Sequence, residues 1–155
     1  MGSRGHKMKS ILTDEKDKRF LKLVEELDYG YHLRIGDELE KYREYNEFKT
    51  PHIVILMMDD DKAIACASYR ASDEKSVEFK RVYVKEQYRK RGIASCIIKE
   101  LEKDAIEKGF KDSHIVTGKN NHAAIGLYEK LGYFKIDKFG QFQEDNTVIC
   151  MRKEF

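Results

Sequence analysis

The sequence predicts an α/β (α+β) fold in which helices cover a mixed β-sheet. Several segments alternate apolar and polar residues with a period of two, and amphipathic helical segments lie between some of them. At 155 residues, with a single proline and no linker or repeat in the sequence, the chain is long enough to form one hydrophobic core. We therefore expect one domain over residues 8–155, preceded by a disordered leader or expression remnant at residues 1–7.

The first third of the chain favours a short strand and two helical segments. The strand is expected over residues 9–12, and Thr13 or Asp14 can cap the helix that follows. The apolar residues that share one face of this helix are Phe20, Leu23, Val24 and Leu27. Gly30 is expected to end it, and a second amphipathic segment is expected over residues 33–48.

The rest of the chain reads as strands with two further helices. Residues 52–58 and 62–69 form a hairpin around the acidic turn 59–61, which can continue neither strand. Later elements are a helix over 93–108 ended by Gly109, a strand over 114–117, a helix over 121–131 ended by Gly132, and strands over 133–138 and 147–152.

The strand over residues 76–84 changes the phase of its apolar side chains. They fall on odd positions in its first half and on even positions in its second half. A β-bulge near Lys80 and Arg81 explains this change, because an extra residue redirects the side chains without ending the strand. A strand buried on both faces would produce the same pattern.

Charge and cysteine content limit the classes of function. The net charge of +2 results from nearly balanced acids and bases, which argues against nucleic acid or a membrane surface as partner. The longest apolar run, residues 53–58, is too short to span a membrane. Cys66, Cys96 and Cys150 lie in apolar runs, so we expect buried free thiols in a cytoplasmic protein.

No metal or nucleotide-triphosphate site is expected from the sequence motifs. His52, His114 and His122 lack cysteine or carboxylate partners at metal-ligand spacing. The chain also contains neither a Gly-x-Ser-x-Gly hydrolase motif nor a Gly-Lys-Ser/Thr phosphate loop. The chemistry must therefore come from other residues.

The most informative stretch is residues 82–95, where a strand runs through Arg-x-x-Gly-x-Ala at 89–94 into an amphipathic helix. The start of a helix offers unpaired amides and the positive end of the dipole, which together bind phosphate. Gly92 lets the backbone approach a ligand, and Ala94 keeps the first turn uncrowded. The basic residues 89–91 could form a solvated turn, but their position favours a phosphate site.

A second motif strengthens this interpretation. It reads Asn121-x-x-Ala-Ile-x-Leu-Tyr128-Glu-Lys-Leu-Gly-Tyr133. With Val82-Tyr83-Val84 and the loop motif, it makes residues 53–152 resemble the Gcn5-related N-acetyltransferase (GNAT) family. The resemblance implies a mostly antiparallel central sheet flanked by helices, with a bulged strand that splays open for acetyl-CoA.

The resemblance also implies the site residues. Those expected to bind the cofactor are Val82, Tyr83, Val84, Arg89, Lys90, Arg91, Gly92, Ile93, Ala94, Ser95 and Asn121. Tyr128 is expected to protonate the departing sulfur, although its ring could instead simply pack in the core. Glu78 resembles an acidic residue that a bacterial subset carries at this point, and is the candidate base. It could equally be a solvent-facing carboxylate paired across the sheet.

The expected function is transfer of acetyl from acetyl-CoA to a primary amine of a small molecule or peptide by direct attack, without a metal. The oxyanion would be stabilised by the backbone amide around Val84. Related folds often dimerise through exposed strands or helices, so a homodimer is compatible with the family. The alternative is a non-catalytic acyl-CoA-binding or regulatory module that kept the fold without turnover.

Overall fold

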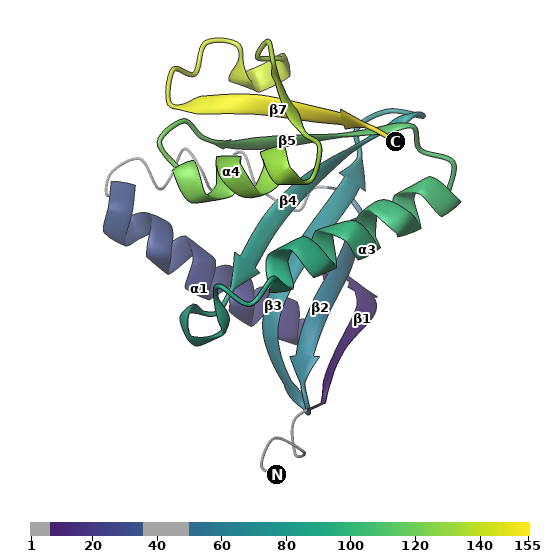
Figure 1. Cartoon of the computed structure of the whole chain (residues 1–155), viewed down its shortest axis with the longest axis vertical. Coiled ribbons are helices and arrows are strands. Elements are labelled where there is room, and N and C mark those ends of the chain that lie inside the picture. Colours follow the sequence, from purple (N-terminus) through teal and green to yellow (C-terminus); the bar gives the residue numbers. More distant parts are fainter. Residues whose placement is uncertain (1–6, 36–49) are drawn as a thin grey trace.

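Figure 1 shows the computed structural model of the chain, which describes residues 7–35 and 50–155. The strands are β1 (Met8–Asp14), β2 (Ile53–Asp59), β3 (Lys62–Ala71), β4 (Ser76–Val84), β5 (Asp112–Gly118), β6 (Phe134–Ile136) and β7 (Val148–Glu154). The helices are α1 (Lys18–Ile35), α3 (Ile93–Glu107) and α4 (His122–Lys130), with short 3-10 turns η3 (Glu86–Tyr88) and η4 (Gly140–Phe142).

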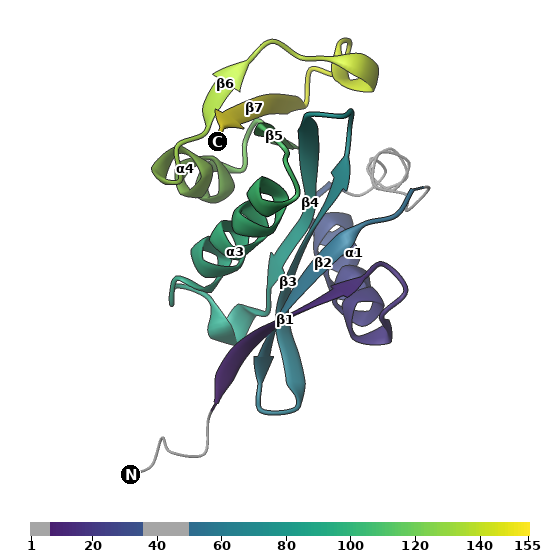
Figure 2. The ribbon, with the colours of Figure 1, turned by 90° about the vertical axis from the view of Figure 1, so that its right-hand side faces the viewer.

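These strands form one sheet in the order β1-β2-β3-β4-β5-β7-β6. Every neighbouring pair is antiparallel except β4 and β5, which are parallel. Helices α3 and α4 cover one face of the sheet and α1 covers the other (Figure 2). This arrangement confirms the predicted mixed, mostly antiparallel sheet flanked by helices.

The alternation of side chains divides the core between the two faces. Val77 and Phe79 of β4 pack with Ile97 and Leu101 of α3 in the larger cluster. The smaller cluster joins Phe20, Leu23 and Val24 of α1 to Val54, Leu56, Met58 and Cys66 of the sheet. The apolar face predicted for the first helix is therefore confirmed.

The bulge predicted in β4 is present. Two residues of β4, Arg81 and Val82, lie between the register pairs Ser68–Lys80 and Cys66–Tyr83, whereas β3 has only one residue there. Arg81 has a φ of +58°, a left-handed conformation that turns the strand at this point. Residues 76–81 are also buried on both faces, so both explanations of the sequence pattern hold.

The first helix begins and ends at residues other than those predicted. It begins at Lys18, and the Asp17 carboxylate caps it by accepting a hydrogen bond from the Arg19 amide (2.9 Å). Thr13 and Asp14 belong instead to β1. The helix continues through Gly30 to Ile35, because a glycine ends a helix only when it leaves the helical conformation.

The predicted segment 33–48 contributes its first three residues to α1, and the remainder lies outside the described residues. Cys66 and Cys150 are buried as expected, but Cys96 is exposed. The expectation for Cys96 was wrong because its neighbours Ile97 and Ile98 form the inner face of α3. Within residues 7–35 and 50–155, no helix combines the length and apolar character needed to cross a membrane.

Candidate active site

The start of α3 presents backbone amides that precede the first hydrogen bond of the helix. That bond runs from the Cys96 amide to the Gly92 carbonyl (3.1 Å), so the amides of residues 93–95 have no partner within the helix. Gly92 is the N-cap residue, where no side chain caps the helix. Its φ of +76° is a left-handed conformation that suits glycine. An anion placed here would meet these amides and the positive end of the helix dipole.

A cavity of about 500 Å³ lies at this helix start. Its walls come from the end of β4, the loop that follows, the first turn of α3 and one face of α4. Of the predicted cofactor-binding residues, it is lined by Val84, Arg89, Lys90, Gly92, Ile93, Ala94 and Ser95. The structure thus brings most of the loop motif to one cavity.

The sequence placed the helix over 121–131 at the cofactor through Asn121 and Tyr128, but it did not predict which residues of α4 line this cavity. The additional lining residues are Tyr88, His122, Ala123, Gly126, Leu127 and Lys130. His122, Gly126 and Lys130 follow one another at four-residue intervals, so they share one face of the helix. This spacing was a usable signal, and Lys130 adds positive charge to the cavity.

Strands β4 and β5 part beside the cavity. They pair only from Ser76–Asp112 to Phe79–Ile115, although β4 continues to Val84 and β5 continues to Gly118. The two strands therefore diverge beyond the bulge (Figure 1). Such an opening in a sheet gives a ligand access to backbone groups that are otherwise used in strand pairing.

The residues of the parted strand point to different faces. Val82 and Val84 pack against the cluster on the α3 side. The Tyr83 ring packs on the α1 side, where its hydroxyl donates to Glu26 (3.1 Å). Neither Val82 nor Tyr83 lines the cavity. If these two residues contact a cofactor, they do so through their backbone.

The arginines of the loop are held by local contacts. Arg89 Nε donates to the Val84 carbonyl (2.8 Å), and its guanidinium lies 5.7 Å from the Tyr83 ring centre. Arg91 donates to the Gln87 carbonyl (3.2 Å), lies over the Tyr88 ring and does not line the cavity. Of the predicted basic side chains, Lys90 has no such contact among the described residues and lines the cavity.

Asn121 and Tyr128 occupy structural positions on α4. Asn121 is the N-cap residue, and its side-chain oxygen accepts a hydrogen bond from the Ala124 amide (3.2 Å). Tyr128 is 6% exposed, and its ring lies edge-on to Tyr133 at 6.1 Å. Neither residue lines the cavity. The sequence spacing that places them on one helix face therefore does not bring their side chains into this cavity.

Glu78 lies on the α1 face of the sheet, because its neighbours Val77 and Phe79 point to α3. It is 3% exposed, so it is not the solvent-facing carboxylate of the alternative interpretation. It is, however, paired across the sheet with Arg70 of β3, whose Nη2 lies 2.6 Å from one carboxylate oxygen. Lys80 of its own strand has its Nζ 3.6 Å from the other oxygen.

Further charged groups surround this carboxylate. Burial lowers the pKa of Lys80, while the nearby Glu78 opposes that shift. Burial also lowers the pKa of His52 to about 4, and the charges of Lys80 and Arg70 act in the same direction. Arg81 forms an ion pair with Asp28 of α1 (2.6 Å). The α1 face beneath the parted strands is therefore a buried polar region.

The site thus has two sides. The α3 side offers a cavity with helix amides and basic residues, and the α1 side offers the carboxylate of Glu78 between Arg70 and the buried Lys80. The gap between β4 and β5 lies between them. Among the described residues, no three His, Cys, Asp or Glu side chains are grouped to bind a metal ion.

The amino-acid sequences of known proteins match parts of this sequence. The protein called "Probable N-acetyltransferase 14" from Xenopus tropicalis is 30% identical over 97 residues, which is 62% of this chain and 47% of that protein. An acetyltransferase of Pectobacterium atrosepticum is 44% identical over 50 residues, 32% of this chain and 36% of that protein. The chain spans less than half the length of these two relatives.

Solved structures share the whole arrangement. A Klebsiella pneumoniae protein assigned as an acyl-CoA N-acyltransferase aligns with a TM-score of 0.75 and 26% identity, covering 94% of this chain and 97% of that one. The PaiA N-acetyltransferase of Thermoplasma acidophilum, in complex with coenzyme A, aligns with a TM-score of 0.71 and 19% identity, covering 94% and 99%. The model of the acetyltransferase (GNAT) family matches residues 14–133, which include the parted strands, the α3 loop and α4, and the chain therefore belongs to that family.

Proposed function

We propose that this protein is an acetyl-CoA-dependent N-acetyltransferase that transfers acetyl to a primary amine of a small molecule or peptide. The observation that carries the proposal is the cavity at the start of α3, which lies beside the gap between β4 and β5. A cofactor bound in the cavity could extend its acyl group into this gap, and an acceptor could approach from the polar α1 face. Family membership supports the same activity.

The amides of residues 93–95 are the proposed ligands of the coenzyme A pyrophosphate, with Gly92 allowing close approach. Lys90 and Lys130 line the cavity and would balance the phosphate charge. Arg89 and Arg91 are assigned to the same region, where Arg89 would have to give up its bond to the Val84 carbonyl to reach a phosphate. The coenzyme A complex of the Thermoplasma PaiA enzyme, which shares this fold, supports the assignment.

The pantetheine arm and the thioester are assigned to the gap beyond Phe79, along the backbone of residues 82–84. The Val84 amide is the proposed donor to the oxyanion that forms when the amine attacks. Holding amine and thioester together in the gap lowers the entropic cost of the reaction. Asn121 is proposed to fix the cofactor arm with the part of its amide that does not cap α4.

Two side chains are proposed to move protons. Tyr128 would protonate the departing coenzyme A thiolate, which requires its hydroxyl to reach the gap from its buried position on α4. Glu78 would remove a proton from the acceptor ammonium, directly or through water. The acceptor itself is proposed only as a class, a primary amine.

A second candidate is a non-catalytic acyl-CoA-binding or regulatory module. It is favoured by one observation, the position of Tyr128 in the core outside the cavity. Such a module would bind coenzyme A through the same amides but would lack an acid for the leaving thiolate. The two candidates therefore agree on binding and differ in turnover.

A thiol-release screen separates the two candidates. The protein is incubated with acetyl-CoA and spermidine, glucosamine, an amino acid, tyramine or a tripeptide with a free amino terminus, while calorimetry measures coenzyme A affinity. The enzyme is expected to release thiol with at least one amine. Coenzyme A binding without thiol release from any of them would support the binding module, and absence of binding would reject both candidates.

A further inference from the structure

Four side chains form a row across the α1 face of the sheet, close to the point where β4 and β5 part. The strand register pairs Arg70 with Glu78, Glu78 with His114 and His114 with Arg152. Because neighbouring strands lie about 4.8 Å apart, each side chain of this row stands next to the following one. The row lies one residue before the last β4–β5 pair.

His114 shares the face of Glu78. The next residue of β5, Ile115, packs in the α3-side cluster together with Phe79 of β4. Since side chains alternate along a strand, His114 and Glu78 both point to the opposite face. His114 is partly buried, and its ring lies edge-on to Phe139 at 5.2 Å. This imidazole therefore stands beside the proposed acceptor face in a semi-enclosed position.

Both oxygens of the Glu78 carboxylate already lie near cationic side chains. One of its oxygens is 2.6 Å from Arg70, and the other is 3.6 Å from Lys80. A proton on this carboxylate would weaken at least one of these ion pairs. A carboxylate paired in this way is suited to stabilise positive charge on a neighbouring group, as the carboxylate of a catalytic triad does for its imidazole.

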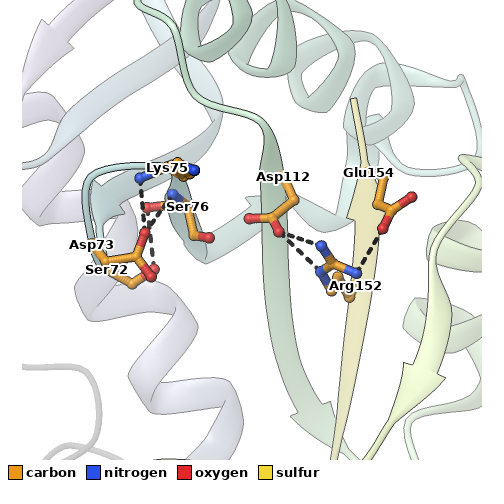
Figure 3. A network of polar contacts seen from close by, with 7 residues as sticks. All are labelled: Ser72, Asp73, Lys75, Ser76, Asp112, Arg152 and Glu154. Atoms are coloured by element: carbon orange, nitrogen blue, oxygen red, sulfur yellow. Dashed lines mark hydrogen bonds and ion pairs between the residues drawn. The ribbon is translucent and has the colours of Figure 1, made fainter.

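Among the described residues, the other charged or titratable groups near His114 include Asp112 on its own strand, Arg152 and Cys150 on β7, and Lys138 beside Phe139. Arg152 forms two ion pairs, which Figure 3 shows. Its guanidinium lies 2.5 Å from Asp112 and 3.0 Å from Glu154. Asp112 binds Arg152 through Oδ2, whereas Glu78 is the carboxylate directly in register with the imidazole on the β4 side.

We propose that His114 is a catalytic residue that takes the proton from the acceptor ammonium, and that Glu78 is a positioning residue that stabilises the imidazolium formed. In this step an N–H bond of the ammonium breaks, its electron pair stays on the amine nitrogen, and the proton binds the imidazole. The neutral amine then attacks the thioester, and the imidazolium returns its proton to water. The inference rests on the proposed function and refines the role given there to Glu78.

The pH profile of kcat/KM tests this inference, measured by thiol release with the amine of the screen that reacts fastest. A histidine base is expected to give an acidic limb between about pH 5 and 8. His114→Gln should lower kcat/KM at pH 7 by about 10²-fold and abolish that limb, with the coenzyme A dissociation constant unchanged. Glu78→Gln should retain the limb but shift its midpoint to lower pH, because the imidazolium loses its stabilising charge.

The matched control is Glu154→Gln, which removes an exposed charge paired with Arg152 at the far end of the row and should leave the profile unchanged. The proposal is overturned if the limb survives in His114→Gln, if it disappears only in Glu78→Gln, or if Glu154→Gln removes it too. Should His114→Gln not fold, NMR titration of the wild-type imidazole decides, since its midpoint must match the kinetic one within about half a pH unit. Wild-type protein that releases no thiol with any amine would instead refute the proposed function.

Discussion

Arg81, at the bulge of β4, forms an ion pair of 2.6 Å with Asp28 of α1. The Arg81 side chain is 5% exposed and that of Asp28 is 20% exposed, so the pair is largely shielded from water. The bulge is the point at which β4 turns away from its regular register, and this contact ties it to the helix on the other layer. The geometry of the gap between β4 and β5 therefore depends on a contact with α1.

Asp28→Asn is expected to destabilise the protein by about 1 to 3 kcal/mol, because it removes the charge that Arg81 faces. For a chain of this size the melting temperature should fall by roughly 2 to 4 °C for each kcal/mol. Thermal unfolding measures the effect. The control is Asp61→Asn in the exposed β2–β3 turn, which should change the melting temperature little. Equal shifts of the melting temperature in both variants would show that the Arg81–Asp28 ion pair does not stabilise the protein.

Gly92→Asp is expected to weaken coenzyme A binding by at least about tenfold, because a carboxylate would lie next to the amides assigned to the pyrophosphate. Calorimetric titration measures this. Gly109→Asp is the matched control: Gly109 also has a left-handed φ and no atom within 4 Å of an added Cβ, but it lies at the other end of α3. Comparable losses of affinity in both variants would contradict the assignment of the loop.

Burial of His52 predicts a loss of stability in mild acid. Its pKa is lowered to about 4 in the folded protein, so between about pH 6.5 and 4 the unfolded chain takes up the proton and the folded protein does not. This difference should cost about 2 kcal/mol between pH 7 and pH 5. Urea unfolding at the two pH values, in the wild type and in His52→Gln, measures it. The glutamine variant should lose less stability on acidification; an equal loss would show that His52 does not carry the effect.

The carboxylates with lowered pKa act in a separate, more acidic window. Hydrogen bonding to Arg19 lowers the pKa of Asp17, and hydrogen bonds from Ser76 and Arg152 lower that of Asp112 against the opposing effect of burial. Their stabilisation is present above the unfolded value near 3.8 and is lost as the pH falls below it. These two carboxylates therefore contribute little between pH 7 and pH 5, and the comparison with His52→Gln assigns the loss in that step to His52.

Features that depend on a local sequence pattern could be predicted from the sequence. The phase change in residues 76–84 predicts the bulge because side-chain direction alternates strictly in a strand. The start of α3 was predictable because Gly92 stands directly before an amphipathic segment. In contrast, the continuation of α1 through Gly30 could not be predicted, because the surrounding structure decides whether a glycine stays helical.

Contacts between secondary-structure elements could not be predicted from the sequence. The row from Arg70 to Arg152 requires the order and register of four strands, one pair of them parallel, which no local pattern specifies. The sequence therefore pointed to Glu78 but not to its neighbour His114, which it treated as a histidine without partners. The face of α4 that lines the cavity was visible as a four-residue spacing, but its significance depended on where α4 packs.

Tyr128→Phe tests the residue on which the enzyme proposal most depends. The change removes a hydroxyl and keeps the ring that packs against Tyr133, so the core should be little disturbed. A lost general acid lowers kcat by about 10² to 10⁴, which corresponds to roughly 3 to 5 kcal/mol of transition-state stabilisation. The measurement is kcat and melting temperature on the same preparation.

Tyr133→Phe is the matched control, because the Tyr133 hydroxyl bonds Ser113 and Glu102 in the core and has no proposed part in catalysis. Its loss should lower stability by about 1 to 3 kcal/mol and leave kcat nearly unchanged. If Tyr128→Phe behaves in the same way, with kcat reduced less than about threefold and a lower melting temperature, Tyr128 is a core residue. The reaction would then need another acid, and the binding module would become the stronger candidate.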